Sequence, residues 1–400
     1  MYQIHYKIIT FGLISNDMLE NLKKQFSDLF GQESKNDFFA PGRVNLIGEH
    51  IDYNGGLVLP SAVTFGTYLL TAPNKDGVFR FRSTNFDDKL DIPVQDAYTK
   101  EGKEWFYYPL GVIHNFVQDG KKVEGLDLLF FGNLPIGSGL SSSASVEVVM
   151  AYALNQLFNA GYSRLDIVKL AKRVENEFIG VNSGIMDQFA VTFGEENKAL
   201  KLNCESLDYE AVECNLGDHY LAIINTNKPR KLAESKYNER VSECETALKS
   251  LQHKLIINNL CDIDAETFHA NKALISDAVV LKRAEHVVEE NERVHLATKA
   301  LAENRLEDFG QLMYASHESL KSLYEVSGVE LDTIVEFSLA YPEVTGARMT
   351  GAGFGGCAIA LVKKTAFEDF STKIIDYYTS KIGYAPSVYS SEIGKGVSEL

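Results

Sequence analysis

The sequence predicts a protein of two domains in the α/β (α+β) class. With 400 residues, of which 45% are hydrophobic, the chain can bury more than one large core. An apolar run at residues 126–131 predicts a buried strand, and after a glycine-rich turn an apolar run of helical length follows at 146–158. The residue pattern then changes near position 200, so we expect one domain over residues 1–200 and a second over 201–400.

Charge and composition exclude several classes of partner. A net charge of −16 disfavours non-specific binding to nucleic acid or to anionic membranes. The five cysteines are scattered without metal-ligand spacing, which is typical of a reduced, cytoplasmic protein. Residues 1–15 lack an uninterrupted apolar core and a cleavage site, so we interpret them as a strand or an extension and not as a signal peptide. No run of residues reaches transmembrane length.

The first elements follow from spacing and turn chemistry. Apolar residues at helical spacing predict a helix over residues 16–29. Residues 68–72 and 78–83 resemble strands, and the Asn-Lys-Asp-Gly turn at 74–77 predicts that they pair as a hairpin. The aromatic run at 105–109 precedes an amphipathic helix, and we interpret it as core packing in preference to a base-stacking site.

A polar segment at residues 38–63 is the first candidate site. Its charged residues lie among glycines, which favours a loop, but also among valines and leucines, which favours burial. Buried charges need partners, and Glu49, His50 and Asp52 offer acceptors for the hydroxyl groups of a polyol, while Arg43 offers a fixed positive fork. The alternative is a solvated loop with ordinary surface charges.

The segment LPIGSGLSSSAS, residues 134–145, which we call the serine turn, is the second candidate site. Gly137 and Gly139 allow a tight turn and close approach to a ligand, and the serines fall at the start of a helix, where anions bind. The chain has no Gly-Lys-Ser/Thr ending of a P-loop, and Ser142 stands where a dinucleotide fingerprint needs its third glycine. A simple N-cap role for the serines is the alternative, which the turn alone does not exclude.

Three acidic residues after this turn are further candidates. A helix capped by Ser163 is expected to run to about Phe178, and Glu175 and Glu177 near its end oppose the helix dipole, so one of them is held there for a reason such as metal binding. Asp187 lies in an otherwise apolar setting. It is either a helix N-terminal acid or a catalytic carboxylate close to the serine turn.

The second half begins with a predicted strand at residues 219–225 and continues with a long helix. Helical patterns fill residues 265–340, where single histidines without metal-ligand spacing favour surface or packing roles. Glycines packed densely at 346–356 predict close approach of the backbone to a neighbour or ligand, and a buried strand follows them. A last helix is expected over 363–381.

Three of these segments together resemble one protein family. GLSSSAS (residues 139–145), APGRVNLIGEHIDYNGG (40–56) and MTGAGFGGC (349–357) are similar to motifs of the GHMP kinases, which phosphorylate sugars, mevalonate and other small molecules. Within that family, GRVNLIGEHIDY and GIMDQ (184–188) resemble the galactokinases. The resemblance covers about residues 39–357 in the expected order, and departs from the family at Ile51, where threonine is common.

The resemblance implies a GHMP-kinase-like fold with ATP and sugar in the cleft between two domains. It implies that Asp187 is the catalytic base or the acid that orients the anomeric hydroxyl, with Arg43 beside it to keep it ionised. The residues that would bind the sugar are Glu49, His50, Ile51, Asp52, Gly184 and Tyr237. Those that would contact the nucleotide are Ser83, Gly137, Ser138, Gly139, Leu140, Ser141, Ser142 and Ser143. Mg²⁺ would be bound by Ser143 and Glu175.

The implied function is ATP-dependent phosphorylation of the C1 hydroxyl of α-D-galactose, the first step of galactose catabolism, by a monomeric cytoplasmic enzyme. An N-acetylgalactosamine kinase is the nearest alternative, and the sequence does not measure the room beside C2 that it needs. Mevalonate and homoserine kinases lack the EHIDY segment. A non-catalytic sugar sensor on the same fold would be expected to lose Asp187 or to shorten the serine turn, and here both are intact.

Overall fold

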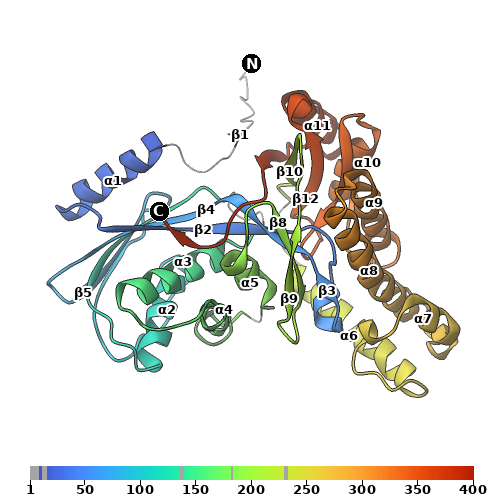
Figure 1. Ribbon diagram of the computed structural model, residues 1–400, viewed down its shortest axis with the longest axis horizontal. Helices are drawn as coiled ribbons and strands as arrows, with labels where there is room; N and C mark the ends of the chain where they lie inside the picture. The colour runs from blue at the N-terminus through green and yellow to red at the C-terminus, as the bar shows by residue number, and fades with distance from the viewer. Residues whose placement is uncertain (1–8, 11–15, 136–138, 182, 229–232) are drawn as a thin grey trace.

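The structure of the protein is a computed structural model (Figure 1) that describes residues 9–10, 16–135, 139–181, 183–228 and 233–400. Two of the expected nucleotide contacts, Gly137 and Ser138, lie outside the described residues. Within the described ranges, no helix has the length and apolar character needed to cross a membrane.

Six of the described strands form the sheet of the N-terminal half, in the order β14-β2-β4-β7-β5-β6. These strands are β2 (Asn36–Asn45), β4 (Pro60–Pro73), β5 (Val78–Ser83), β6 (Leu90–Pro93), β7 (Leu126–Gly132) and β14 (Ser398–Glu399). The helices of this half are α1 (Asn16–Phe30), α2 (Tyr107–Gln118), α3 (Ser142–Leu157), α4 (Arg164–Arg173) and α5 (Met186–Phe193).

Alternation along the strands sorts the helices onto the two faces of this sheet. Leu70 of β4 and Leu129 of β7 pack with Phe26 of α1, whereas their neighbours Leu69 and Leu128 belong to the larger core beneath α2 and α3. Successive strand residues point to opposite faces, so adjacent leucines serve different cores. Figure 1 accordingly shows α1 alone on one side of β2 and β4, and α2 to α5 on the other.

The expected hairpin between residues 68–72 and 78–83 is wrong. Both segments are strands, but β7 lies between them, antiparallel to β4 and parallel to β5. The Asn74 side chain donates to the backbone oxygen of Val78 (2.8 Å) and to Asp127 of β7 (3.0 Å), so the turn crosses the start of β7. Because β7 is apolar, it is stable in the interior of the sheet, with a partner strand on each edge. The turn signal between β4 and β5 carries no information about this later strand.

A second sheet, in the order β1-β13-β10-β12-β11, organises the C-terminal half of the described chain. Its strands are β1 (Ile9–Thr10), β10 (His219–Asn225), β11 (Val344–Thr350), β12 (Cys357–Lys363) and β13 (Ser387–Ser391). Helices α9, α10 and α11 pack against it, and α8 packs on α9 and α6. The helices of this half are α6 (Ala233–Gln252), α7 (Ala265–Asn271), α8 (Ala278–Ala302), α9 (Leu306–Ser322), α10 (Val329–Ala340) and α11 (Phe367–Ile382).

A small sheet of β3 (Leu57–Val58), β8 (Lys198–Asn203) and β9 (Tyr209–Glu213) lies at the junction of the two halves. The largest hydrophobic core is continuous across that junction, since Val44 and Phe65 share it with Leu221 and Ile359. The terminal strands also cross: β1 pairs with β13, and β14 pairs with β2. The boundary near residue 200 stays a prediction.

Candidate active site

A cavity of about 160 Å³, which we call the clamp cavity, brings together residues far apart in the sequence. It is lined by Arg43, Glu49, His50, Asp52, Ser183, Gly184, Met186, Asp187, Tyr237, Gly351 and Ala352. The expected catalytic pair is therefore in one cavity with the expected sugar-binding residues, apart from Ile51. The Ile51 side chain is fully buried in the large core, as its apolar character requires.

Arg43 and Asp187 form a two-pronged ion pair in this cavity. Arg43 Nε donates to Asp187 Oδ1 (2.9 Å) and Nη2 to Oδ2 (2.8 Å), while Nη1 donates to the carbonyl oxygen of Gly139 (2.7 Å). The pairing of β2 with β4 shifts register between Pro41 and Arg43, an irregularity of the kind that redirects a side chain next to a site. Arg43 thus connects the carboxylate to the serine turn.

The serine turn approaches Asp187 directly. Ser141, whose φ of 62° is in the left-handed region, donates a hydrogen bond from its hydroxyl to Asp187 Oδ2. Asp187 lies in the first turn of α5, where the positive end of the helix dipole stabilises a carboxylate. Two charged or polar donors and a helix N-terminus therefore hold Asp187 in one orientation.

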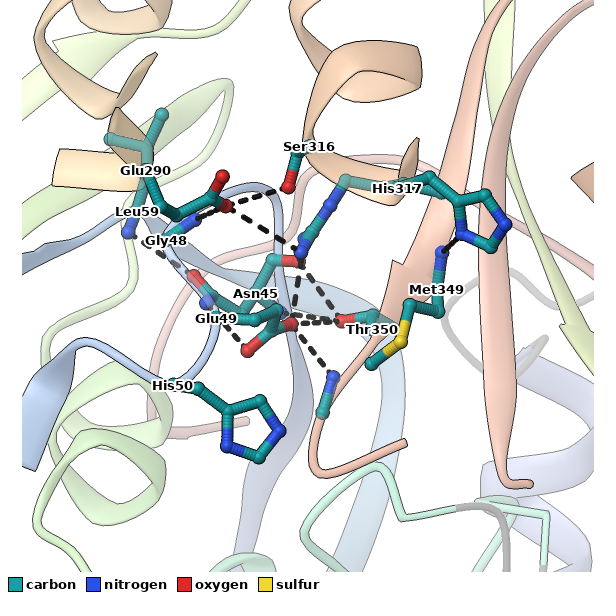
Figure 2. Close-up of polar contacts among 12 residues, drawn as sticks. Asn45, Gly48, Glu49, His50, Leu59, Glu290, Ser316, His317, Met349 and Thr350 are labelled. Atoms are coloured by element: carbon teal, nitrogen blue, oxygen red, sulfur yellow. Dashed lines mark hydrogen bonds and ion pairs between the residues drawn. The ribbon is translucent and has the colours of Figure 1, made fainter. Parts of the chain in front are cut away.

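Glu49 is fixed by four donors, most of them from the opposite half of the chain (Figure 2). Its Oε1 accepts from the backbone N–H of Gly351 (2.7 Å) and the hydroxyl of Thr350 (3.1 Å), and Arg348 Nη1 is 3.4 Å away. Its Oε2 accepts only from Asn45 Nδ2 (3.0 Å) among these contacts. A carboxylate oxygen has two lone pairs, so Oε2 retains the capacity to accept from a ligand hydroxyl.

His50 and Asp52 have pKa values that are shifted in opposite directions, and His50 is also fixed by hydrogen bonds. His50 Nε2–H donates to the carbonyl oxygen of Ala352 (3.2 Å), because a carbonyl only accepts, and Nδ1 therefore accepts from the Tyr53 hydroxyl (2.9 Å). Burial lowers the pKa of His50 to about 3, so the imidazole is neutral near pH 7. Burial and the nearby carboxylates of Glu49 and Asp187 raise the pKa of Asp52 to about 6.

Tyr237 closes the clamp cavity from α6. Its ring lies against those of His50 and Tyr53, with centroid separations of 5.5 and 5.4 Å. Burial and the carboxylates of Asp52, Asp187 and Glu49 raise the pKa of Tyr237, so its hydroxyl keeps its proton and can donate.

A second cavity of about 410 Å³, the aromatic cavity, lies on the other side of the serine turn. Its lining includes three of the expected nucleotide residues, Ser83, Ser142 and Ser143. It also includes Phe86, together with Trp105 and Tyr108 from the aromatic run at 105–109 that we interpreted as core packing. Gly139 and Leu140 line neither cavity. The carbonyl oxygen of Gly139 accepts from Arg43 Nη1, and that of Leu140 accepts from the Arg43 backbone N–H.

The sequence argument preferred core packing to base stacking for Trp105, because a buried aromatic and a stacking aromatic have the same pattern; Trp105 packs against the core with one part and lines the cavity with another. The structure separates them: Phe106 is buried, whereas Trp105 stacks near Phe86 (centroids 6.4 Å apart, 19° between planes) at the cavity wall. The indole N–H of Trp105 donates to the carbonyl oxygen of Asp88 (2.9 Å), which fixes the ring. The face of a fixed indole suits a planar base.

Ser143, at the wall of the aromatic cavity, contacts the buried Glu175 behind it. The Ser143 hydroxyl donates to Glu175 Oε1 (2.6 Å), and Gln188 Nε2 donates to Oε2 (3.0 Å). Glu175 lies in η2 (Val174–Ile179), a π-helical turn that continues α4. Such turns are rare and concentrate at functional sites, and here the wider turn carries a buried carboxylate.

Three family models match the chain. The galactokinase galactose-binding signature matches residues 24–73, the GHMP kinase N-terminal domain matches 108–195, and the GHMP kinase C-terminal domain matches 297–379. The galactokinases of Clostridium tetani and Enterococcus faecalis are each 48% identical, over 96% of this chain and 99% and 100% of theirs. The chain belongs to the galactokinase family.

Solved structures agree with this family. The structure of Lactococcus lactis galactokinase complexed with galactose is 45% identical, covers 96% of this chain and 100% of its own, and superposes with a TM-score of 0.89. Methanococcus jannaschii mevalonate kinase, at 20% identity and a TM-score of 0.68, shares the fold. As a galactokinase-family member, the chain is an ATP-dependent sugar kinase with the two-domain GHMP fold.

Proposed function

We propose that this kinase transfers the γ-phosphoryl group of ATP to the anomeric C1 hydroxyl of α-D-galactose, giving galactose 1-phosphate and ADP at the start of galactose catabolism. The observation that carries the proposal is the serine turn, which separates two cavities. Ser141 contacts Asp187 in the clamp cavity, and the next two residues line the aromatic cavity. The relative solved with galactose, nearly identical in fold, supports the choice of sugar.

The clamp cavity supplies the acceptors that a sugar requires. Glu49 Oε2 and the carboxylate of Asp52 would accept from sugar hydroxyls, and Tyr237 would donate from its hydroxyl. Because Glu49 is already fixed by protein donors, little conformational entropy is lost when the sugar binds. The backbone at Gly184 completes the wall without a side chain that would fill the cavity.

Asp187 would act on the C1 hydroxyl itself. Held by Arg43 and Ser141, Asp187 would accept a hydrogen bond from that hydroxyl and so orient the hydroxyl oxygen of the sugar toward the γ-phosphorus of ATP. Phosphoryl transfer has a loose, metaphosphate-like transition state, so the proton would move to Asp187 late, as the new bond forms. Arg43 would stabilise the charge on the transferring group.

The nucleotide would occupy the aromatic cavity, its base against Trp105 and its phosphates along the serine turn. The donor set of Glu175 and Ser143 consists of hard oxygens, one of them a buried carboxylate, and therefore fits Mg²⁺. When bound, the ion would neutralise phosphate charge, which allows a protein of net charge −16 to bind ATP.

The test is Mg²⁺-dependent ATP turnover with galactose, N-acetylgalactosamine, glucose, mevalonate and homoserine, with Asp187→Asn measured beside the wild type. We expect turnover with galactose and a loss of about 10²–10⁴-fold in kcat for the variant. Preference for N-acetylgalactosamine would correct the substrate and leave the mechanism. Galactose binding without turnover in the wild type would overturn the proposed reaction.

A further inference from the structure

Helix α8 contacts the backbone of the segment that carries the clamp residues, here called the clamp loop (residues 48–57). His286 Nε2 hydrogen-bonds the carbonyl oxygen of Glu49 (3.2 Å), and Glu290 Oε1 accepts from the backbone N–H of Gly48 (3.0 Å). Asn291 Oδ1 accepts from the N–H of Leu57 (3.1 Å). His286 and Glu290 are four positions apart and lie on one face of α8, and Asn291 is the next residue, so one stretch of α8 holds both ends of the clamp loop.

The contact with Gly48 is a close one. Gly48 has a φ of 98°, and a Cβ added there would come within 2.6 Å of the carbonyl oxygen of Leu57 and 2.9 Å of the Val294 side chain. The backbone therefore lies flat against α8, with its N–H directed at the Glu290 carboxylate. Only glycine permits this approach.

Glu290 is a fully buried carboxylate with several partners (Figure 2). Besides Gly48, its oxygens accept from the Ser316 hydroxyl and from Arg293 Nε, both at 2.6 Å, and Arg348 Nη2 is 4.0 Å away. Burial opposes ionisation of Glu290, but Arg293, His286 and Arg348 outweigh it and lower its pKa to about 2. The carboxylate is therefore charged near pH 7.

Arg348 links Glu290 to Glu49. Its side chain is fully buried between the two carboxylates, and its Nη1 contacts Glu49 Oε1 (3.4 Å) and the carbonyl oxygen of Asn45 (3.2 Å). Removal of one carboxylate partner would leave part of the charge of this buried guanidinium uncompensated, so Arg348 would depend more on Glu49. The position of the Glu49 carboxylate thus depends on the charge of Glu290.

Resting on the proposed function, we propose that Glu290 is a positioning residue for galactose binding. It fixes the clamp loop through Gly48 and balances Arg348 so that Glu49 presents its free lone pair to the sugar. It does not touch the sugar, since the clamp cavity lining excludes it. Its removal weakens galactose binding selectively, because the aromatic cavity is lined by other elements.

The experiment compares Glu290→Gln with the wild type and with a matched control, Asp127→Asn. Asp127 is also a buried carboxylate with three donors, from Arg80, Asn74 and Gln32, but it lies at the start of β7, away from both cavities. Folding of each variant is verified by thermal melting. Ser316→Ala, which removes one donor to Glu290, is the milder second variant if Glu290→Gln does not fold.

Calorimetric titration and steady-state kinetics give the decisive measurements. We expect Glu290→Gln to weaken galactose binding and raise its KM by about tenfold or more, with Ser316→Ala intermediate and the KM for ATP within about twofold of wild type. Asp127→Asn should lower the melting temperature and leave galactose binding and the KM for galactose unchanged. Equal effects on galactose and ATP, or unchanged galactose affinity in Glu290→Gln, would overturn the positioning role.

Hydrogen exchange of the ligand-free protein separates this inference from the proposed function. Peptides that cover the clamp loop should exchange faster in Glu290→Gln than in the wild type or in Asp127→Asn. This readout holds even if the wild type fails to bind galactose, a result that would overturn the substrate and not the role of Glu290 in the loop. Unchanged exchange in Glu290→Gln would refute that role.

Discussion

Asp52 faces the clamp cavity with a carboxyl group whose pKa is raised to about 6 by burial and by Glu49 and Asp187. A carboxylate accepts hydrogen bonds from two hydroxyls, whereas its protonated form loses part of that capacity. The ionised form therefore binds the sugar better, and its population falls as the pH drops through about 6. His50 of the same loop, with a pKa of about 3, and Glu290 of α8, with a pKa of about 2, do not titrate in this window.

Galactose affinity should accordingly be constant above about pH 7 and fall by up to about tenfold per unit below pH 6. Titration calorimetry between about pH 5 and 8 measures this dependence. The Asp52→Asn variant should bind more weakly at pH 7 and lose the dependence. A wild-type affinity that stays level down to about pH 5 would contradict the assignment to Asp52.

Arg43 binds Asp187 through two nitrogens of one fork and the carbonyl oxygen of Gly139 through a third. A lysine carries the same charge but cannot reproduce three donors in fixed directions. We expect Arg43→Lys to lower kcat by about 10²-fold, with galactose affinity within about threefold of wild type.

Arg82→Lys is the matched control for this prediction. Arg82 makes the same two-pronged contact with Asp91 (2.6 and 3.1 Å), on β5 and β6, and lines neither cavity. Stopped-flow or steady-state assays should show no loss of kcat in the control. A comparable loss in both variants would mean that the effect is not specific to Asp187.

Among the elements, the turn before α2 contributes Trp105, the sole tryptophan of the chain, to the aromatic cavity. Intrinsic tryptophan fluorescence should therefore change on addition of ATP or ADP and not on addition of galactose alone. Trp105→Ala should raise the KM for ATP by about five- to a hundredfold, because stacking on a base is worth about 1–3 kcal/mol. The KM for galactose serves as the internal control, and an equal rise in it would argue for general damage to the fold.

Local patterns predicted the elements well but not their partners. The helices at residues 16–30 and 142–157 and the strands at 126–132 and 219–225 follow from apolar spacing, and Ser163 caps α4 as expected. The hairpin failed because β7, distant in sequence, pairs with both of its strands. Strand order depends on competition between distant segments, which no turn signal contains.

Contacts between segments distant in sequence also limited the prediction of the candidate site. Motif resemblance gathered most residues of the clamp cavity, because each motif is a short run whose residues stay together in the fold. Glu290 escaped it because its contact with the Gly48 N–H joins segments 242 residues apart, and Ser316 escaped it because it acts only through Glu290. Trp105 escaped it because its aromatic neighbours suggested a core.

At the scale of the whole molecule, residues 396–400 return to the N-terminal half. Val397 is 1% exposed and its N–H donates to the carbonyl oxygen of Val191 in α5 (2.9 Å), while β14 pairs with β2. The two elements that this tail binds are those that carry Asp187 and Arg43. It therefore supports the catalytic pair from outside the cavity.

Deletion of residues 397–400 should lower the free energy of unfolding by about 2–4 kcal/mol, from one buried valine and several hydrogen bonds. Urea denaturation of the deletion variant measures this loss. Leu400→Ala is the control, because the Leu400 side chain is 49% exposed and should contribute little. A deletion variant as stable as the wild type would show that the tail is only loosely attached.

The crossing of the terminal strands also bears on how such a protein can evolve. Each of the two larger sheets contains a strand from the far end of the chain, β1 in one and β14 in the other. A recombination event near residue 200 would give each half a foreign strand at the edge of its sheet, together with a mismatched share of the common core. The two halves should consequently be exchangeable only together, so a chimera joined near residue 200 is expected to be less stable than either parent.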